Sequence, residues 1–546
     1  MFKALLNLQS EKVCNAVRAA GSLRIASRTT APIFEIQRCH SSVAKSAQLA
    51  YHGGHQQFVS STAGSVSMQL RLTFFVQSTV CLMACAFGMA QTESVLSQDL
   101  ALKKGQATKQ PNIIVVFCDD LGYGDLGCFG NPTIATPNLD QMAAEGMKFT
   151  QFYAAASVCT PSRAALLTGR LPLRSGMCSN KRRVLFPNSK GGLPADEVTI
   201  AEVLKGQGYA TACVGKWHLG HLQQFLPTRQ GFDSYFGIPY SNDMDRVASA
   251  PKGRASFLNP KIEFWNVPLL RNEKVIEQPA DQRTITRRYT EEAVDFVTKN
   301  QDHPFFLYLP HSMPHVPLFR STGFEGRSKR GLFGDVIEEI DWSVGRILET
   351  LKTLKLDQQT LVLFTSDNGP WLIFNEHGGS AGMLRDGKGS TWEGGMREPT
   401  VAWWPGTIKP GRICRDVAST MDLFATACAL AGAELPTERV LDSYDLSPLL
   451  RGDGGSGRKL LFYYRGFNLM AVRKGPWKMH LMTQDAYGAG ARQAVTHDPP
   501  ILYHLEHDPS ERINVAEKHP ELLKEILEDV ELHRKQLQPA ESQLEL

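Results

Sequence analysis

The stretch NIIVVFCDD, residues 112–120, is a continuous apolar run that ends in two aspartates. An uninterrupted apolar run of this length is typical of a strand buried on both faces of a sheet. Because ligands bind to open α/β sheets at the carboxyl ends of the parallel strands, such an ending predicts a functional edge. Three further runs repeat the pattern: Tyr209–Val214 before GKWH, Pro304–Leu309 before PHSMPH, and Leu361–Thr365 before SDNG.

The segments between these runs carry helical patterns. Apolar residues recur at helical spacing from Val336 to Leu354, and weaker candidates are Thr286–Asn300 and Met421–Ala431. We therefore expect an α/β fold over residues 111–455, in which helices enclose a large mixed, mostly parallel sheet.

The pattern changes from about Lys459 onwards. Short β-rich segments separated by Gly-containing breaks predict an antiparallel sheet, and residues 516–537 predict an amphipathic, charged helix. We expect a small C-terminal α+β domain over residues 456–546. Its predicted strands are Leu460–Tyr464, Leu469–Val472 and Trp477–Leu481.

Residues 68–90 have a basic start, an apolar middle and a small-residue end, the pattern of a secretory signal peptide. We interpret residues 1–67 as an upstream extension, with a transit peptide as the alternative. The apolar run is short for a membrane-spanning helix, and Leu82–Cys85 leaves a lipoprotein anchor open. Residues 91–110 are polar and are interpreted as a linker. After removal of the signal peptide we expect a mature protein that begins near Gln91 and is periplasmic or secreted.

The composition is that of a globular chain. Hydrophobic residues make up 42% and charged residues 21%, which excludes a disordered or fibrous protein. Residues 1–67 hold seven basic and two acidic residues, a charge of +5, so the remainder carries −1 of the net +4. The body therefore has no basic surplus for nucleic acid. Seven of the eleven cysteines follow the signal-like segment, an odd number that leaves at least one unpaired.

The segment CTPSR begins at Cys159 and is followed by AALLTGR. Thr160 is a good N-cap residue, Pro161 suits the first helical position and Gly169 suits the helix end. Cys159 is then expected at a helix N-terminus, where N–H groups and the helix dipole favour anions, with Arg163 as a permanent cation one turn further. Taken alone, the segment also fits an ordinary cysteine near a cap.

The residues that follow two of the predicted strands suit a hard metal ion. Asp119, Asp120, Asp367 and Asn368 offer only oxygen ligands, which fits Ca²⁺, or Mg²⁺ if the site is tight, and disfavours zinc. Asp-Asp and Asp-Asn-Gly are also ordinary turn sequences. Two such turns at one sheet edge favour a shared cation.

CTPSR resembles the signature C-x-P-S-R of the sulfatase family, which precedes a helix that ends in T-G-R. The resemblance covers roughly residues 111–540, and the segment GIPYSND at 237–243 is most similar to arylsulfatase A-type enzymes and their bacterial relatives. Further matches occur in order: DD at 119–120, GKWHLG at 215–220, PHVP at 314–317, SDNG at 366–369 and KGSTWEGG at 388–395.

The resemblance implies an alkaline-phosphatase-like fold and the hydrolysis of sulfate esters of aryl, carbohydrate or glycolipid type. It implies that a maturation enzyme oxidises Cys159 to Cα-formylglycine, whose hydrated aldehyde is the nucleophile. It also implies that Asp119, Asp120, Asp367 and Asn368 form a calcium site, with the modified Cys159 as a further ligand.

The resemblance assigns further roles. His218 would help to expel sulfate, His315 and Lys388 would face the leaving oxygen as proton donors, and Ser241 would contact the sulfate. Histidines can transfer protons near neutral pH, and preorganised cations stabilise the charge that develops on the sulfate. The expected cations beside the metal are Arg163, Lys216 and Lys388, and the expected substrate contacts are Ser241, Lys216, His315 and Lys388.

Two alternatives to a sulfatase remain at this stage. One is a phosphoester or phosphonate hydrolase on the same scaffold, and the other is an inactive protein that binds sulfated glycans. The sequence also leaves open whether the protein forms a homo-oligomer. We expect substrate specificity to depend on the loops at 176–192, 240–275 and 483–498, and we assign His311 and the other body cysteines to structural roles.

Overall fold

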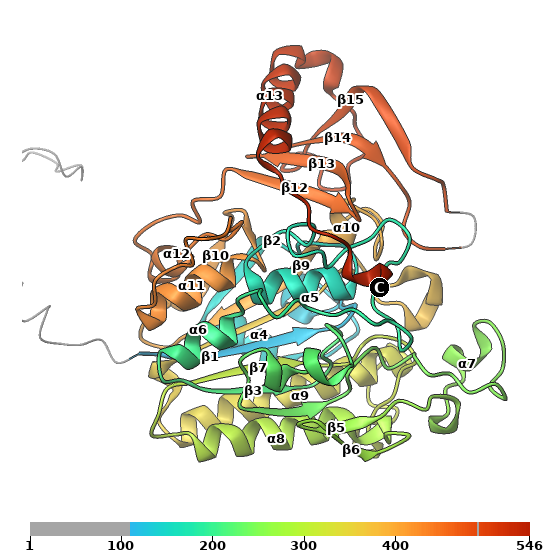
Figure 1. Ribbon diagram of the computed structural model, residues 1–546, viewed down its shortest axis with the longest axis vertical. Helices are drawn as coiled ribbons and strands as arrows, with labels where there is room; N and C mark the ends of the chain where they lie inside the picture. The colour runs from blue at the N-terminus through green and yellow to red at the C-terminus, as the bar shows by residue number, and fades with distance from the viewer. Residues whose placement is uncertain (1–109, 489–490) are drawn as a thin grey trace, which may run out of the picture. The chain divides into compact units, whose positions relative to one another are not determined.

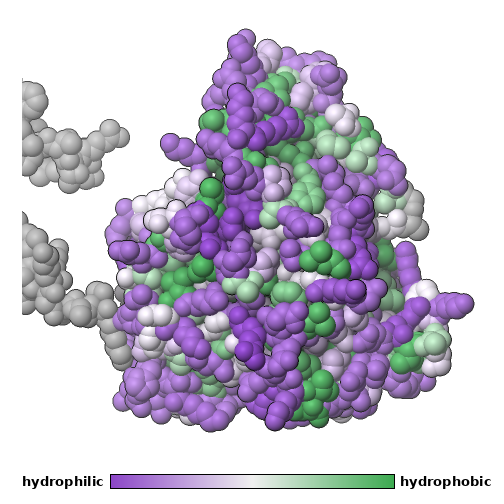
Figure 2. Space-filling model, viewed as in Figure 1, coloured by the Kyte–Doolittle hydropathy of each residue, from purple (hydrophilic) through white to green (hydrophobic). Residues whose placement is uncertain are grey.

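β1, formed by Asn112–Cys118, lies in the middle of a large sheet (Figure 1). The computed structural model describes residues 110–488 and 491–546, so the predicted upstream extension, signal peptide and most of the linker lie outside the described residues. Within these two ranges, no helix is long and apolar enough to cross a membrane. On the face shown in Figure 2, polar residues predominate and apolar residues occur in small separate patches.

The other strands of this sheet are β2 (Met147–Tyr153), β3 (Ala210–Val214), β4 (Ser234–Gly237), β5 (Leu269–Arg271), β6 (Lys274–Glu277), β7 (Phe305–Pro310), β8 (Thr360–Ser366), β9 (Arg397–Trp403), β10 (Arg412–Cys414) and β11 (Ala418–Ser419). Their order is β10-β2-β9-β8-β1-β7-β3-β4-β5-β6, with β11 beside β2. The five strands from β8 to β4 run parallel, whereas β9 is antiparallel to both of its neighbours. This confirms the prediction of a large, mostly parallel mixed sheet.

Helices cover both faces of the large sheet because alternate residues of its central strands point to opposite sides. Ile114 and Val116 of β1 pack in one core cluster, and Ile113 and Val115 pack in another. The first cluster includes α4 (Pro137–Glu145), α8 (Ile285–Lys299) and α9 (Gly331–Thr353). The second includes α5 (Cys159–Thr168), α6 (Ile200–Gly206), α11 (Asp422–Ala431) and α12 (Ser447–Arg451).

The C-terminal region contains a separate antiparallel sheet, as predicted (Figure 1). Its strands are β12 (Leu460–Arg465), β13 (Asn468–Lys474), β14 (Trp477–Thr483) and β15 (Val495–His504), and α13 (Pro520–Gln536) packs against it. β15 was not predicted, because it contains Pro499 and Pro500. Proline lacks the N–H that a central strand needs, but β15 is an edge strand, where proline is tolerated.

Buried charges join this sheet to the large one. Glu393, in the short helix α10 (Glu393–Met396), accepts hydrogen bonds from Lys478 at 2.9 Å and from the Tyr153 hydroxyl at 2.6 Å. Glu511 accepts from the Glu393 N–H at 2.7 Å and lies 3.0 Å from the Lys478 ammonium. Because all four side chains are buried, these contacts hold α10 firmly against β14.

Candidate active site

The polar residues that follow the central strands converge at one edge of the sheet, as the sequence predicts. They are joined there by Cys159 and Arg163 of α5 and by Lys388 in the loop before α10. The side chains are all buried, and each candidate lies close to at least one other. The predicted candidates are Asp119 and Asp120 after β1, Lys216 and His218 after β3, Ser241 after β4, His315 after β7, and Asp367 and Asn368 after β8.

Cys159 is the first residue of α5, whose N-cap is Val158. The prediction that Thr160 caps the helix is therefore wrong. The Thr160 hydroxyl instead donates to the carbonyl oxygen of His218 at 3.0 Å and accepts from the N–H of Leu185 at 3.2 Å. Gly169 ends the helix in the left-handed region, as expected. The Cys159 thiol thus lies at the positive end of the helix dipole.

The Cys159 thiol lies between a carboxylate and an ammonium group. Its Sγ donates to Asp119 Oδ1 at 3.3 Å, and Lys388 Nζ approaches Sγ at 3.6 Å. Burial, and then the negative charge of Asp119, raise the pKa of Cys159 well above the usual range. The thiol is therefore protonated near neutral pH and is a poor nucleophile as it stands.

Asp119 contacts two of the cationic side chains. Lys216 forms a short ion pair with it and also donates to Ser241 Oγ at 3.1 Å. Arg163 lies 3.6 Å from Asp119 and donates twice to Asp367 Oδ2, at 2.7 and 3.0 Å. Burial raises the pKa of Asp119, but the attraction of Lys216 and its other cationic neighbours outweighs burial and holds this pKa well below its usual range.

Asp120 lies at the centre of the remaining contacts. Lys388 Nζ lies 2.7 and 2.8 Å from its two carboxylate oxygens, and Asn368 donates its amide nitrogen to Oδ1 at 2.7 Å. His315 Nε2 lies 3.6 Å from Oδ2. Burial raises the pKa of Asp120 despite the opposing attraction of Lys388.

Several of these side chains could hold a metal ion, and the carboxylate and amide oxygens among them suit a hard cation. One ligand atom each from Asp119, Asp120, Cys159 and His315 lies within 4.8 Å of all the others. Asn368 Oδ1 is buried and has no hydrogen-bond partner among the described residues. An orphaned carbonyl oxygen beside several carboxylates is a natural ligand for such an ion.

Asp367, predicted as a ligand, is positioned differently from the other carboxylates. Its Oδ1 accepts the N–H of Asp120 at 3.2 Å, and its Oδ2 accepts from Arg163. Burial, and then the charge of Asp119, raise the pKa of Asp367 to about 7. An additional positive charge nearby would favour its ionised form.

The two candidate histidines are both kept neutral near pH 7. Burial and then Lys216 lower the pKa of His218, and burial and then Lys388 lower that of His315. His218 Nε2 lies 2.9 Å from the carbonyl oxygen of Leu185, while its Nδ1 is buried without a partner among the described residues. By contrast His311, assigned a structural role, contacts Ser343 Oγ at 3.3 Å.

Sequence reasoning missed Asn242. Its Oδ1 lies 3.0 Å from His315 Nδ1, and its amide nitrogen donates to the carbonyl oxygens of His315 and Pro317 at 3.3 and 3.0 Å. It thus fixes the orientation of the His315 ring. Its position in GIPYSND, directly after Ser241, could have marked Asn242 as a site residue. Nothing in the sequence indicates which ring it contacts.

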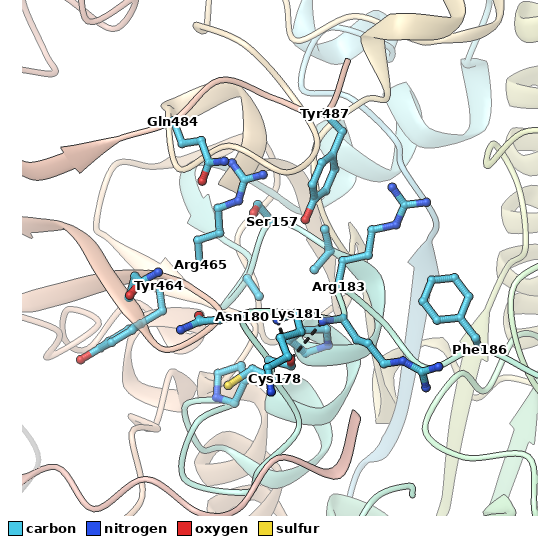
Figure 3. Close-up of a pocket in the computed structure, with 18 residues that line it drawn as sticks. Ser157, Cys178, Asn180, Lys181, Arg183, Phe186, Tyr464, Arg465, Gln484 and Tyr487 are labelled. Carbon is cyan, nitrogen blue, oxygen red and sulfur yellow. Dashed lines mark hydrogen bonds between the residues drawn. The ribbon is translucent and has the colours of Figure 1, made fainter. Parts of the chain in front are cut away.

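Two cavities with a shared wall lie here, and the smaller one opens onto the candidate residues. The inner one, of about 30 Å³, includes Cys159, His218, Ser241, His315 and Lys388 in its wall. The outer one, of about 380 Å³, shares Val158, Arg183 and Phe186 with it (Figure 3). The loops expected to determine specificity contribute to these walls: 176–192 to both, 240–275 to the inner and 483–498 to the outer.

Comparison of the chain with known proteins finds similarity to one family. The family model described as Sulfatase matches residues 111–433, and that described as the C-terminal region of aryl-sulfatase matches residues 456–546. Arylsulfatase A from Homo sapiens is 45% identical over 467 residues, which cover 81% of this chain and 91% of the human protein. N-acetylgalactosamine-6-sulfatase from Sus scrofa is 41% identical, covering 80% and 88%. The solved structure of PsFucS1 sulfatase from Pseudoalteromonas sp. superimposes with a TM-score of 0.72 at 28% identity, covering 82% and 94%.

Proposed function

Since this chain belongs to the sulfatase family and hydrolyses sulfate esters, we propose that Cys159 acts after oxidation to Cα-formylglycine. The observation that carries this proposal is the position of Cys159: a buried residue at the start of α5, in contact with Asp119 and Lys388. Its raised pKa makes the unmodified thiol a poor nucleophile. The hydrated aldehyde of formylglycine would supply a hydroxyl nucleophile instead.

We propose that Asp119, Asp120, Asp367 and Asn368 hold Ca²⁺, with residue 159 as a further ligand. The oxygen-rich donors and the orphaned Asn368 Oδ1 support this choice. When bound, Ca²⁺ would stabilise negative charge on the sulfate oxygens. His315 lies close to these ligands, and the role we propose for it there is proton donation and not metal binding.

The remaining roles, which are sulfate binding, charge stabilisation and proton transfer, would belong to the protein's own side chains. Lys216 and Ser241, which contact each other at 3.1 Å, would hold the sulfate, and Lys388 would stabilise charge beside the nucleophile. His218, neutral near pH 7 because of burial and Lys216, would act as a base. His315 and Lys388 would serve the leaving oxygen, with His315 held in place by Asn242.

The site favours sulfate esters over phosphate monoesters. The described residues contain one cluster of potential metal ligands, in which a single histidine takes part. A phosphate monoester carries more charge, and the related phosphatases resembled by this scaffold use two zinc ions with several histidines. The one oxygen-rich site is therefore better matched to a sulfate ester.

The start of the chain supports a proposal about export. The signal-like segment 68–90 would direct the protein to the periplasm or the outside, and cleavage would leave a chain that begins near Gln91. N-terminal sequencing of the exported protein tests this, and an active mature protein that retains residues 1–67 would contradict it. We further propose that residues 111–455 form the catalytic domain and 456–546 a C-terminal subdomain.

Mass spectrometry of the peptide that contains Cys159 tests the central proposal. Purified protein should show conversion of the thiol to an aldehyde and should release sulfate from para-nitrophenyl sulfate. A fully active protein whose Cys159 remains an unmodified thiol would rule the formylglycine mechanism out. Cys414→Ser is the control, since that cysteine is buried in the edge strand β10 and lies outside both cavities.

A further inference from the structure

Two arginines lie on either side of one aromatic ring in the wall of the outer cavity. The guanidinium of Arg465, from β12, lies 4.8 Å from the centre of the Tyr487 ring, and that of Arg183 lies 5.2 Å from it. Figure 3 shows the Tyr487 ring between the two side chains. Arg183 also lies 5.5 Å from the ring of Trp371. Such stacking orients the guanidinium planes and leaves their edges able to donate hydrogen bonds.

These two arginines have no acidic partner within ion-pair distance among the described residues, unlike their neighbour Lys181 in the same wall. Lys181 pairs with Glu545 at 2.8 Å. Arg465 makes one hydrogen bond, to the carbonyl oxygen of Asp485 at 3.1 Å. Among the described residues no aspartate or glutamate lines the outer cavity, and the charge of Arg183 acts on Asp243 in the wall of the inner one.

The ring between the arginines is fixed to the catalytic loop. The Tyr487 N–H donates to the carbonyl oxygen of Lys388 at 3.3 Å. Its ring packs directly on Gly389, where a Cβ would lie 2.3 Å from a ring carbon and where the backbone is left-handed at φ 89°. The arginines are therefore held at a defined position relative to Lys388, which lines the inner cavity.

We propose that Arg183, and Arg465 on the other side of the Tyr487 ring, bind further anionic parts of the substrate while its sulfate ester occupies the inner cavity. Arg183 borders both cavities, so it lies where the two parts of such a substrate would meet. Guanidinium groups bind sulfate and carboxylate through paired, charge-assisted hydrogen bonds. The substrate class is then an acidic saccharide sulfate that carries a further sulfate or a carboxylate. This proposal rests on the proposed sulfatase function of the inner site.

The test compares substrates that differ only in the second anion. Sulfate release is measured for three disaccharides with the same scissile sulfate, whose second sugar is neutral, carries a carboxylate, or carries a second sulfate. Arg183→Gln and Arg465→Gln should each lower kcat/KM for an anionic disaccharide about tenfold more than for the neutral one, the scale of one charge-assisted hydrogen bond. The two anionic substrates show which group the arginines prefer.

A matched control comes from another surface of the protein. Arg327 lies 4.8 Å from the centre of the Phe324 ring, has no ion-pair partner among the described residues, and lies outside both cavities. Arg327→Gln should therefore leave the ratio between the substrates unchanged. Equal losses on all three disaccharides in the Arg183 and Arg465 variants, or a wild-type enzyme without preference for the anionic ones, would overturn the proposal.

Binding measurements separate this proposal from the mechanism itself. Calorimetry with the Cys159→Ala protein reports the affinity for each disaccharide without turnover. Tighter binding of the anionic disaccharides that is lost in the Arg465→Gln background would support the two-arginine site even if the wild type released no sulfate. Absence of sulfate release from every substrate, para-nitrophenyl sulfate included, would count against the proposed function alone.

Discussion

Asn368 donates its amide nitrogen to Asp120 at 2.7 Å, yet its own Oδ1 is buried and accepts from none of the described residues. A buried carbonyl oxygen normally accepts a hydrogen bond or binds a cation, because leaving it unpaired costs free energy. The amide nitrogen is held by Asp120 and by the carbonyl oxygen of Gly369, and a half-turn of the amide would direct Oδ1 towards the carboxylates, where a bound cation would accept it as a ligand. This arrangement favours a metal ion as the missing partner.

Removal of divalent ions should abolish sulfate release, and Ca²⁺ should restore it better than Mg²⁺. Calcium should also raise the midpoint of thermal unfolding, since a ligand that binds only the folded state stabilises it. Asn368→Leu keeps the size of the side chain and removes Oδ1, so it should weaken both effects. Full activity after exhaustive chelation, in protein shown to be free of metal, would exclude a catalytic ion.

Replacement of Cys159 should separate binding from turnover. Cys159→Ala should bind substrate and release no sulfate, because the nucleophile is absent. Cys159→Ser offers one hydroxyl, which has no second hydroxyl to expel a transferred sulfate, so it should stop after at most one turnover. Intact mass after exposure to substrate would then show a trapped sulfate. Wild-type turnover by Cys159→Ala would require another nucleophile.

His315→Asn should affect poor leaving groups most. Nitrophenolate leaves without a proton, whereas a sugar alkoxide needs one, so we expect a loss of about 10² to 10⁴ in kcat on a carbohydrate sulfate and a smaller loss on para-nitrophenyl sulfate. Because His315 also lies beside the proposed metal ligands, the metal content of the variant must be measured. Equal losses on both substrates, with metal retained, would contradict a proton-donor role.

Lys478→Met should destabilise the protein strongly. It leaves the buried carboxylates of Glu393 and Glu511 without their shared cation, which typically costs about 3–5 kcal/mol. Lys474→Met is the control, because Lys474 pairs with Glu525 at a partly exposed position and should cost no more than about 1 kcal/mol. Urea unfolding measures both. Similar costs would show that the buried charges contribute little.

His533 should make the protein less stable in acid. Burial lowers its pKa to about 4, so an unfolded chain with an ordinary histidine binds a proton below about pH 6.5 that the folded chain does not. Unfolding free energy should therefore fall by about 2 kcal/mol between about pH 7 and pH 5 from this residue alone. His533→Phe keeps a ring stacked on Phe462 and should reduce that fall. His303→Phe, at an exposed position, is the control for the exchange of a histidine for phenylalanine as such.

The central strands could be predicted because their signal is local. β1 coincides with the predicted run, and β3, β7 and β8 begin within one residue of theirs, since strands buried on both faces must be continuously apolar. The same reasoning predicted that Asp119, Asp120 and Asp367 lie at one edge of the sheet. Thr160 was assigned wrongly as a helix cap, because its hydroxyl forms hydrogen bonds with the backbone of His218 and Leu185 instead of with the helix end.

The outer cavity could not be predicted, because its wall comes from distant segments. Arg183, Arg465 and Tyr487 show no shared periodicity or motif, and only the packing of the C-terminal sheet beside loop 176–192 brings them together. Asn242 was missed for the same reason. Patterns in a sequence report on burial and backbone conformation, whereas the partner of a given side chain depends on the completed fold.

The burial of Cys159 limits when it can be modified. Only 2% of the surface of Cys159 is exposed, so a modifying enzyme could not reach the thiol in the folded protein. The segments that bring His315 and Lys388 over the thiol lie downstream, so they are synthesised after it. The proposed oxidation of Cys159 would therefore compete with folding while the chain is being synthesised. We expect conditions that slow folding to raise the converted fraction, and rapid overproduction to lower it.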